Sequence, residues 1–285
     1  MCKIAVIGGS GLYTMPGLED IQERVIETPF GDPSAPIVIG NLEGQSVAFL
    51  ARHGIGHHLS PTEINYRANI YALKSLGVER IVGISACGSL REDFAPGDIV
   101  VPDQLFDFTK ERERTFFTGG LVAHVSIAEP FCSDLSESVY QAVQSTSNAV
   151  HMGGSYITIE GPRFSTRAES NTYRAWGMSI IGMTTSPEAF LAREAEICYA
   201  TISHVTDYDV WHISEKPVTV ELVIEILNRN TAIAQQAVKT LVRNLNSQRD
   251  CNCPNAMADA FITDQGVISA ETRKKLHLLV RKYLD

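Results

Sequence analysis

The sequence lacks an excess of positive charge and has no run of basic residues. Its 24 lysines and arginines are outnumbered by 33 aspartates and glutamates, which gives a formal net charge of −9. Proteins that bind nucleic acid or an anionic membrane usually carry a basic patch. We therefore expect neither as a partner, although a small anion can still bind where a few cationic side chains converge.

Long apolar runs and frequent cysteines are absent as well. No apolar run approaches the ~20 residues needed to cross a bilayer, so we expect no membrane span. The apolar run at residues 4–7 is too short for the core of a signal peptide and is typical of a buried first strand. Six cysteines in 285 residues do not indicate a disulfide scaffold. We expect a cytoplasmic protein.

Short apolar runs recur along the chain and predict β-strands. Several are apolar throughout, which is typical of strands covered on both faces. Asn41-Leu-Glu-Gly44 lies between two of these runs and predicts a hairpin, so the sheet should be mixed rather than all parallel. The predicted strands lie at residues 4–7, 36–39, 46–50, 80–85, 98–102, 155–159, 178–183 and 197–205.

Helical patterns separate the predicted strands. The first begins at Ser60-Pro-Thr-Glu63, which is typical of a capping box with proline in the first turn. Alternating strands and helices predict an α/β sandwich, a single domain with a central mixed sheet flanked by helices. We expect this domain to span residues 1–246, followed by a C-terminal extension at 247–285 that ends in a helix. The predicted helices lie at residues 60–76, 134–144, 165–176, 187–196, 218–245 and 270–284.

Groups that bind anions follow three of the predicted strands. Gly8-Gly9-Ser10-Gly11 offers backbone N–H groups and a hydroxyl. Arg52 offers a planar fork suited to a tetrahedral oxyanion, His53 offers a second donor beside it, and Ser85 offers a second hydroxyl. Each signal is weak alone: the glycines are better explained as a tight turn, and a surface ion pair stays open as an alternative for Arg52. Because ligands of α/β sheets gather outside the carboxyl ends of strands, the three together predict a phosphate site.

Other cofactor sites fit the sequence poorly. The dinucleotide fingerprint would need glycine at position 14, where Thr14 stands, and no P-loop motif is present. His53, His57 and His58 suggest zinc, but the glycines between them argue against a helix and no third ligand is near. We therefore expect no metal site. Cys87 has no evident base nearby and is better explained as a small buried thiol.

Aromatic and acidic residues follow two later strands. Phe164 could stack on a flat ring, while Ser165 either caps the next helix, the more common role, or binds a ligand. Asp207 and Asp209 could bind a metal, act in acid–base catalysis, or begin a solvated loop. Their position after an apolar strand favours a ligand role, since a buried aspartate can hold a proton near neutrality.

Eight segments, taken in order, resemble the trimeric purine nucleoside phosphorylase family, and within it the S-methyl-5′-thioadenosine phosphorylase branch. The resemblance covers about residues 3–245. It rests on Gly8-Gly9-Ser10-Gly11-Leu12, Thr28-Pro-Phe-Gly31, Arg52-His53-Gly54, Asn65-Tyr-Arg-Ala-Asn69, Ser85-Ala-Cys-Gly-Ser89, Ala128-Glu-Pro-Phe131, Glu160-Gly-Pro-Arg-Phe164 and Thr206-Asp-Tyr-Asp209.

The resemblance implies that a purine nucleoside is cleaved by inorganic phosphate, a co-substrate, with no cofactor. It implies a homotrimer whose sites lie near subunit interfaces, acting in purine and methionine salvage. The residues implied to hold phosphate are Ser10, Arg52, His53, Ser85, the backbone of Ala86, and Thr184.

The resemblance also assigns the nucleoside pocket. Asp207 and Asp209 would read the purine, with Asp207 as the catalytic acid. The other implied contacts are Met183 at the ribose, Phe164 and Ser165 at the base, His124 donated by a neighbouring subunit toward the 5′ end, and Val220, Val223 and Ile224 around the methylthio group. Helical spacing of the last three would otherwise indicate core packing.

Hydrogen-bond polarity favours adenine, because aspartate accepts from its exocyclic amine, whereas a 6-oxopurine favours asparagine. One alternative is a 6-oxopurine nucleoside or methylthioinosine phosphorylase. A remote alternative is a non-catalytic nucleoside-binding protein. In the tail, Cys251-Asn-Cys253 resembles a Cys-x-Cys element of some thermophilic relatives. Since so short a disulfide would be strained and reducible, we expect free thiols.

Overall fold

The computed structural model describes residues 2–9, 15–146, 149–212, 219–246 and 248–284. Its centre is a mixed sheet in which the described residues form eleven strands. The strands are β1 (Ile4–Gly8), β2 (Glu19–Arg24), β3 (Ile37–Leu42), β4 (Gln45–Ala51), β5 (Arg80–Ser89), β6 (Ile99–Val101), β7 (Gln104–Phe108), β8 (Val150–Met152), β9 (Ser155–Ile159), β10 (Ile180–Gly182) and β11 (Cys198–Asp207).

The middle of the sheet is parallel and carries the predicted site. The main path runs β2-β3-β4-β1-β5-β10-β9-β7, with β11 paired to β5 and β6, and β8 paired to β6. Strands β4, β1, β5 and β11 are mutually parallel, so their carboxyl ends share one edge. The hairpin predicted at residues 41–44 joins β3 and β4, which pair antiparallel. This confirms the mixed α/β sheet.

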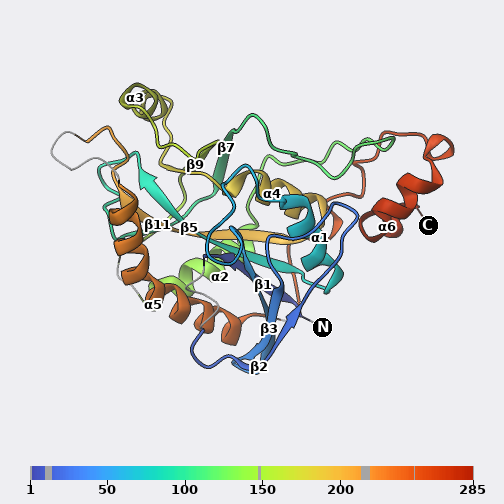
Figure 1. The fold of residues 1–285 in the computed structure, drawn as a ribbon, viewed down its shortest axis with the longest axis horizontal. Coiled ribbons are helices and arrows are strands. Elements are labelled where there is room, and N and C mark those ends of the chain that lie inside the picture. The colour runs from blue at the N-terminus through green and yellow to red at the C-terminus, as the bar shows by residue number, and fades with distance from the viewer. Residues whose placement is uncertain (1, 10–14, 147–148, 213–218, 247, 285) are drawn as a thin grey trace.

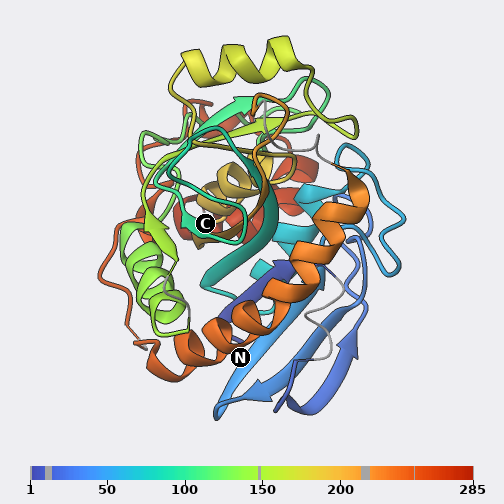
Figure 2. The same ribbon diagram turned by 90° about the vertical axis from the view of Figure 1, so that its left-hand side faces the viewer.

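Helices cover both faces of the sheet because successive side chains of the central strands point to opposite sides. In β1, Ala5 and Ile7 pack into one apolar cluster while Ile4 and Val6 pack into another. The first cluster includes α1 (Tyr66–Ser75) and α4 (Thr185–Glu194), and the second includes α2 (Ser133–Gln144) and α5 (Val220–Asn244). Figure 2 shows α5 lying across its face of the sheet.

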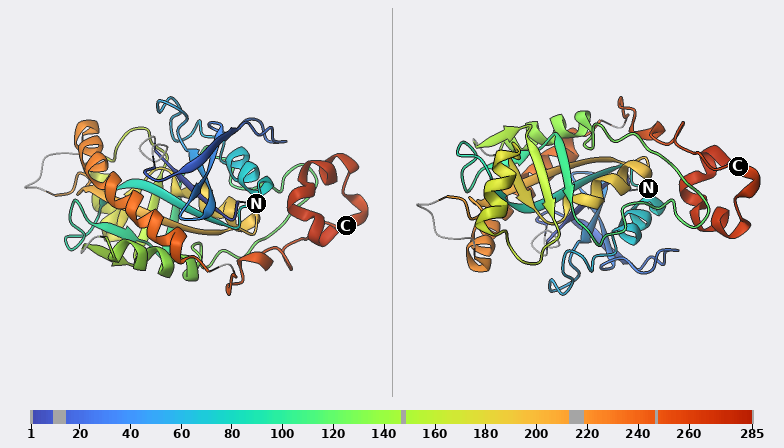
Figure 3. Two further views of the ribbon diagram at one scale, coloured as in Figure 1. Left: turned by 90° about the horizontal axis from the view of Figure 1, so that it is seen from below. Right: turned by 90° about the horizontal axis from the view of Figure 1, so that it is seen from above.

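The segment after residue 246 lies beside the sheet rather than over it (Figures 1 and 3). It contains two short 3-10 helices, η2 (Cys253–Asn255) and η3 (Gln265–Val267), and ends in α6 (Ala270–Leu284). Ala123 and Phe261 form a β-bridge, and the N–H of His124 donates to Ala260 O at 2.8 Å. The extension therefore packs against a loop of the main domain, while the proposed boundary at 246 stays a prediction.

One predicted helix start is wrong. Residues 61–63 form a turn, and α1 begins at Tyr66. The Asn65 side chain caps this helix by accepting from the N–H of Ala68 at 3.1 Å. Glu63 does accept from the N–H of Ser60 at 3.0 Å, so the motif closes a turn instead of opening a helix. None of the helices in the described ranges combines the length and apolar character that a membrane span requires.

Candidate active site

The carboxyl edge of the sheet gathers most of the predicted site residues. Arg52 directly follows β4, and Asp207 ends β11. Met183 and Thr184 follow β10, which runs antiparallel to β5 and pairs with its last residues. Ser85 and Ala86 lie inside β5, which continues to Ser89, so the prediction that this strand ends near Ser85 is wrong. Ser10 and the side chain of Val223 lie outside the described residues.

Arg52 is buried and bound by a carboxylate of the same chain. Its Nε and Nη2 donate to the two oxygens of Glu188, both at 2.8 Å, while Nη1 donates to Ile84 O at 2.8 Å and Nη2 to Ile7 O at 3.1 Å. Burial opposes the charge, but the Glu188 carboxylate outweighs it and raises the pKa of Arg52 above its usual range. Among the described residues these bonds use four of the five guanidinium N–H groups. One Nη1 N–H is left for a ligand, rather than the whole fork.

His53 is held as a neutral ring. Its Nδ1 lies 2.9 Å from Leu59 O, and the ring stacks on His57 with centroids 4.1 Å apart. Burial, with Arg52 and His57 nearby, lowers the pKa of His53 to about 4. Because the Leu59 carbonyl can only accept, Nδ1 carries the proton and Nε2 has a free lone pair. His53 can thus accept from a protonated phosphate oxygen, so the expectation that it donates to the anion is wrong.

Two hydroxyls near this arginine have open bonding capacity. Ser85 Oγ is buried and has no hydrogen-bond partner among the described residues. Thr184 precedes the first turn of α4, but its side chain makes no capping bond to that helix. Backbone N–H groups at a helix start favour anions. Ser85 and Thr184 therefore offer donors of the kind that a phosphate needs.

Asp207 and Asp209 are both buried at the end of β11. Asp207 Oδ2 accepts from Thr206 Oγ1 at 2.6 Å, and Oδ1 accepts from the N–H of Asp209 at 2.7 Å. Burial nevertheless raises the pKa of Asp207 to about 6. A Cβ at Gly88 would lie 2.9 Å from Asp207 Oδ1, so the glycine makes room for this carboxyl group.

Asp209 has an open acceptor. Burial raises its pKa, whereas the nearby hydroxyls of Ser170 and Ser165 act in the opposite direction. Neither hydroxyl makes a hydrogen bond of good geometry, and Asp209 Oδ2 has no partner among the described residues. The cap of α3 (Arg167–Ala175) is Thr166, which forms a capping box with Glu169. Ser165 is therefore not the helix cap that the sequence alone favoured.

The remaining predicted residues divide between this edge and the opposite end. Val220 and Ile224 lie at the start of α5 and are 57% and 51% exposed, and Phe164 is 37% exposed. Apolar side chains this exposed are available to a ligand. His124 pairs instead with the extension, which lies opposite the tip of β5 in Figure 1. The single chain does not bring His124 to the other site residues.

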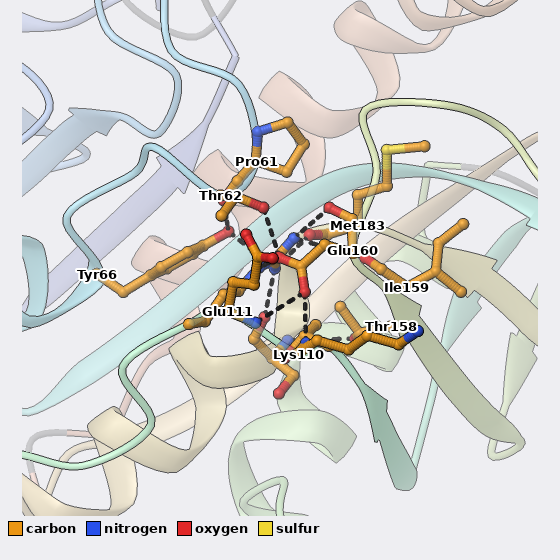
Figure 4. Close-up of polar contacts among 12 residues, drawn as sticks. Pro61, Thr62, Tyr66, Lys110, Glu111, Thr158, Ile159, Glu160 and Met183 are labelled. Atoms are coloured by element: carbon orange, nitrogen blue, oxygen red, sulfur yellow. Dashed lines mark hydrogen bonds and ion pairs between the residues drawn. The ribbon is translucent and has the colours of Figure 1, made fainter.

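Arg112 holds the backbone beside the site and was not predicted. Its Nη1 donates to Met183 O at 2.6 Å and to Ser186 O at 2.8 Å, and Nη2 donates to Glu160 O at 2.7 Å. Its Nε donates to Glu160 Oε1 at 3.1 Å. Figure 4 shows the polar contacts around Glu160, including those with Thr62, Lys110 and Glu111. In the sequence Arg112 stands in the charged run Lys-Glu-Arg-Glu-Arg, which looks like a solvated surface.

Glu160 and Glu188 were likewise not assigned roles. Thr62 Oγ1 donates to Glu160 Oε1 at 2.5 Å, and the N–H groups of Lys110 and Glu111 donate to Glu160 Oε2. Burial would raise the pKa of Glu160, but these bonds lower it to about 2. Glu188 could have been noticed in the sequence, since it is an isolated acidic residue among the apolar residues of α4.

Comparison with known proteins identifies the family of the chain. The model of the phosphorylase superfamily matches residues 3–243. The chain belongs to the phosphorylase superfamily. Among its relatives in this superfamily, the S-methyl-5′-thioadenosine phosphorylase of Geobacter sulfurreducens is 53% identical over 282 residues, 99% of each chain. That of Koribacter versatilis is 50% identical over 99% of this chain and 96% of its own.

Solved structures of the superfamily have the same fold. A methylthioadenosine phosphorylase from an Antarctic soil metagenomic library superposes with a TM-score of 0.93 at 48% identity, covering 98% of this chain and 99% of its own. The methylthioadenosine phosphorylase of Schistosoma mansoni, in complex with adenine, gives 0.85 at 36% identity over 90% of this chain and 96% of its own.

Proposed function

We propose that the protein cleaves S-methyl-5′-thioadenosine with inorganic phosphate, giving adenine and 5-methylthioribose 1-phosphate in purine and methionine salvage. The names and full-length similarity of the relatives support this activity. The observation that carries it is the pair of buried carboxyl groups, Asp207 and Asp209, at the carboxyl end of β11. The reaction needs phosphate as co-substrate and no cofactor.

Phosphate would bind where the anion-binding groups converge. One Arg52 Nη1 N–H, the Ser85 hydroxyl, the Thr184 hydroxyl and the backbone of Ala86 would donate, and His53 Nε2 would accept the proton of a phosphate oxygen. Ser10 would add a hydroxyl. Cleavage of the C–N bond leaves positive charge on the ribosyl ring, so a phosphate held on the opposite face stabilises that charge before it bonds to C1′.

Asp207 would protonate the departing purine. Its pKa of about 6 lets it hold a proton close to neutral pH, and a proton given to N7 neutralises the charge on the leaving base. The unpartnered Oδ2 of Asp209 would accept from the exocyclic amine of adenine, with Ser165 beside it. A 6-oxopurine would instead present an acceptor to this carboxylate, which is unfavourable.

The apolar groups would form the rest of the pocket. Phe164 would stack on the base and Met183 would line the ribose. Val220, Val223 and Ile224 would surround the methylthio group, which an apolar pocket prefers over a hydroxyl by ~1–3 kcal/mol. We therefore expect adenosine to be a slower substrate.

We propose a cytoplasmic homotrimer in which His124 reaches the 5′ end of a nucleoside in the neighbouring subunit. His124 is exposed and pairs with the C-terminal extension, away from the β11 edge of its own chain, which supports this arrangement. Mixing Asp207→Asn with His124→Ala subunits tests it. If both variants are inactive alone, random trimers should regain about a quarter of the sites, since each working site takes its two groups from different chains. A mixture of assembled trimers that regains nothing would contradict the shared site.

A chromatographic assay of purine release tests the choice of base. We expect methylthioadenosine to react fastest, adenosine more slowly, and inosine and methylthioinosine hardly at all. Preference for inosine or methylthioinosine would keep the phosphate site but overturn the roles of Asp207 and Asp209. Tight binding without turnover of any nucleoside would indicate a binding protein.

A further inference from the structure

Four of the six cysteines gather at one place although they are far apart in the sequence. Cys132 precedes the first turn of α2, Cys198 begins β11, and Cys251 and Cys253 come from the C-terminal extension. All four Sγ atoms lie within 4.8 Å of one another, and the Sγ atoms of Cys198 and Cys251 are 3.4 Å apart. Three of the cysteines are buried and Cys251 is partly exposed.

This spacing fits a single metal ion. With Zn–S bonds of about 2.3 Å, the sulfur atoms of a tetrahedral site lie about 3.8 Å apart. The four Sγ atoms need only small shifts to reach that separation. A multi-iron cluster would need more room between the sulfurs than this group allows. We propose that Cys132, Cys198, Cys251 and Cys253 bind one zinc ion.

One cationic side chain contacts this group of cysteines, and both cationic and acidic side chains line the cavity beside it. Binding converts four thiols and Zn²⁺ into a tetrathiolate complex of charge −2 and releases four protons. Arg193 Nη1 donates to Cys253 Sγ at 3.5 Å. Arg80 and Arg249 line an adjacent cavity of about 350 Å³, together with the acidic Asp134 and Asp250. Cys132, Cys198 and Cys251 also line this cavity, which gives an ion a path to the sulfurs.

Disulfide formation is the alternative to zinc binding for these four cysteines. Two disulfides would need an oxidant to take four electrons from the thiols, and phosphorolysis supplies none. Zinc binding requires only loss of protons, so it proceeds in a reducing compartment. The proposal departs from the expectation of no metal, which considered only residues that stand close together in the sequence.

The site would be structural rather than catalytic. Cys198 and Asp207 are the two ends of β11, so the cysteines lie about 30 Å from the proposed acid. A closed set of four protein ligands leaves no open position on the metal. Zinc would tie residues 251–253 to the starts of α2 and β11, and so anchor the extension to the sheet.

Metal analysis of the untagged full-length protein, purified with a reductant and without chelators, tests the proposal. We expect about one zinc per chain in the wild type, as a Cys₄ site requires. Cys251→Ser should lose most of the zinc, whereas Cys2→Ser, which makes the same change at a buried cysteine outside the cluster, should keep it. Chelator treatment should lower the Tm of the wild type and Cys2→Ser by several degrees and leave Cys251→Ser unchanged.

A second measurement uses only the wild type, in case the variant fails to fold. Replacing zinc by Co²⁺ should give the intense visible absorption of a tetrathiolate site, and a mercurial reagent that titrates four thiols should release the ion. Metal-free protein with six free thiols would overturn the proposal. So would disulfides among these cysteines in protein purified without oxidant, or iron in place of zinc.

Discussion

Replacing Asp207 by asparagine should make the enzyme slower and more stable at the same time. The variant keeps the shape of the side chain but holds no acidic proton. Loss of a general acid typically slows a reaction by 10²–10⁴-fold. At the same position, the carboxyl pKa is raised from 3.8 to about 6 by burial, so ionising this group at neutral pH destabilises the folded protein.

The stability change follows from this pKa shift. A shift from 3.8 to about 6 corresponds to about 3 kcal/mol. Between these two pH values the folded chain holds a proton that the unfolded chain has lost, so this contribution to stability is complete below pH 4 and lost as the pH rises through 6. The asparagine side chain does not titrate, so the Asp207→Asn variant should gain up to about 3 kcal/mol on the wild type at pH 8 and nothing extra at pH 4.

The hydrogen bonds around the side chain allow this substitution. The N–H of Asp209 can still donate to the amide oxygen at Oδ1. Thr206 Oγ1 also lies 3.2 Å from Cys87 O, so its hydroxyl can donate there and accept from the new amide N–H group. One of the two N–H groups of the new amide therefore has an acceptor in the protein, which limits the cost of the substitution.

Two assays measure this prediction on one preparation. Urea unfolding at pH 4 and pH 8 gives the stability difference, and initial rates of adenine release give kcat and kcat/KM. Wild-type kcat/KM should fall about tenfold per pH unit above pH 6 as the acid loses its proton. A variant with kcat within a few-fold of the wild type would refute the acid role. A variant destabilised equally at both pH values would refute the reasoning from burial.

Two further substitutions test the packing beneath the site. Glu188→Gln leaves the Arg52 charge buried without its partner and should lower the free energy of unfolding by ~3–5 kcal/mol, whereas Glu43→Gln at an exposed ion pair should cost at most ~1 kcal/mol. Urea unfolding distinguishes them, and equal effects would mean that the Arg52 pair is not buried as described. Gly182→Ala places a Cβ against the Tyr156 hydroxyl, closer than van der Waals contact allows, and should cost ~1–3 kcal/mol. Adding Tyr156→Phe removes that oxygen and should restore part of the loss of Tm; no recovery would place the clash elsewhere.

The sequence predicted the strands that carry the site because each is a short apolar run. It missed β2, whose residues Glu-Asp-Ile-Gln-Glu-Arg are all exposed and give no apolar pattern. It also missed the short strands β7 and β8. The prediction that a helix begins at Ser60 was wrong, because the same capping-box pattern also closes a turn. The helix begins after Asn65, whose side chain caps it.

The site was predictable to the extent that its residues stand in continuous motifs. Arg52 and Asp207 were identified at strand ends, and Ser85 was identified on the right strand although it lies inside it. The partner of Arg52 was not identified, since Glu188 lies 136 residues away. Arg112 gave no signal in a charged run. The group of four cysteines was not predicted either, because its members come together only when α2, β11 and the extension are folded.

The dependence of adenine release on phosphate tests the central claim most directly. Methylthioadenosine is incubated with the phosphate-free protein and with added phosphate, and both products are identified by mass. The account predicts adenine and 5-methylthioribose 1-phosphate in equal amounts, formed only when phosphate is present. Adenine released at the same rate without phosphate, together with free 5-methylthioribose, would show that water is the nucleophile and would contradict the phosphate site.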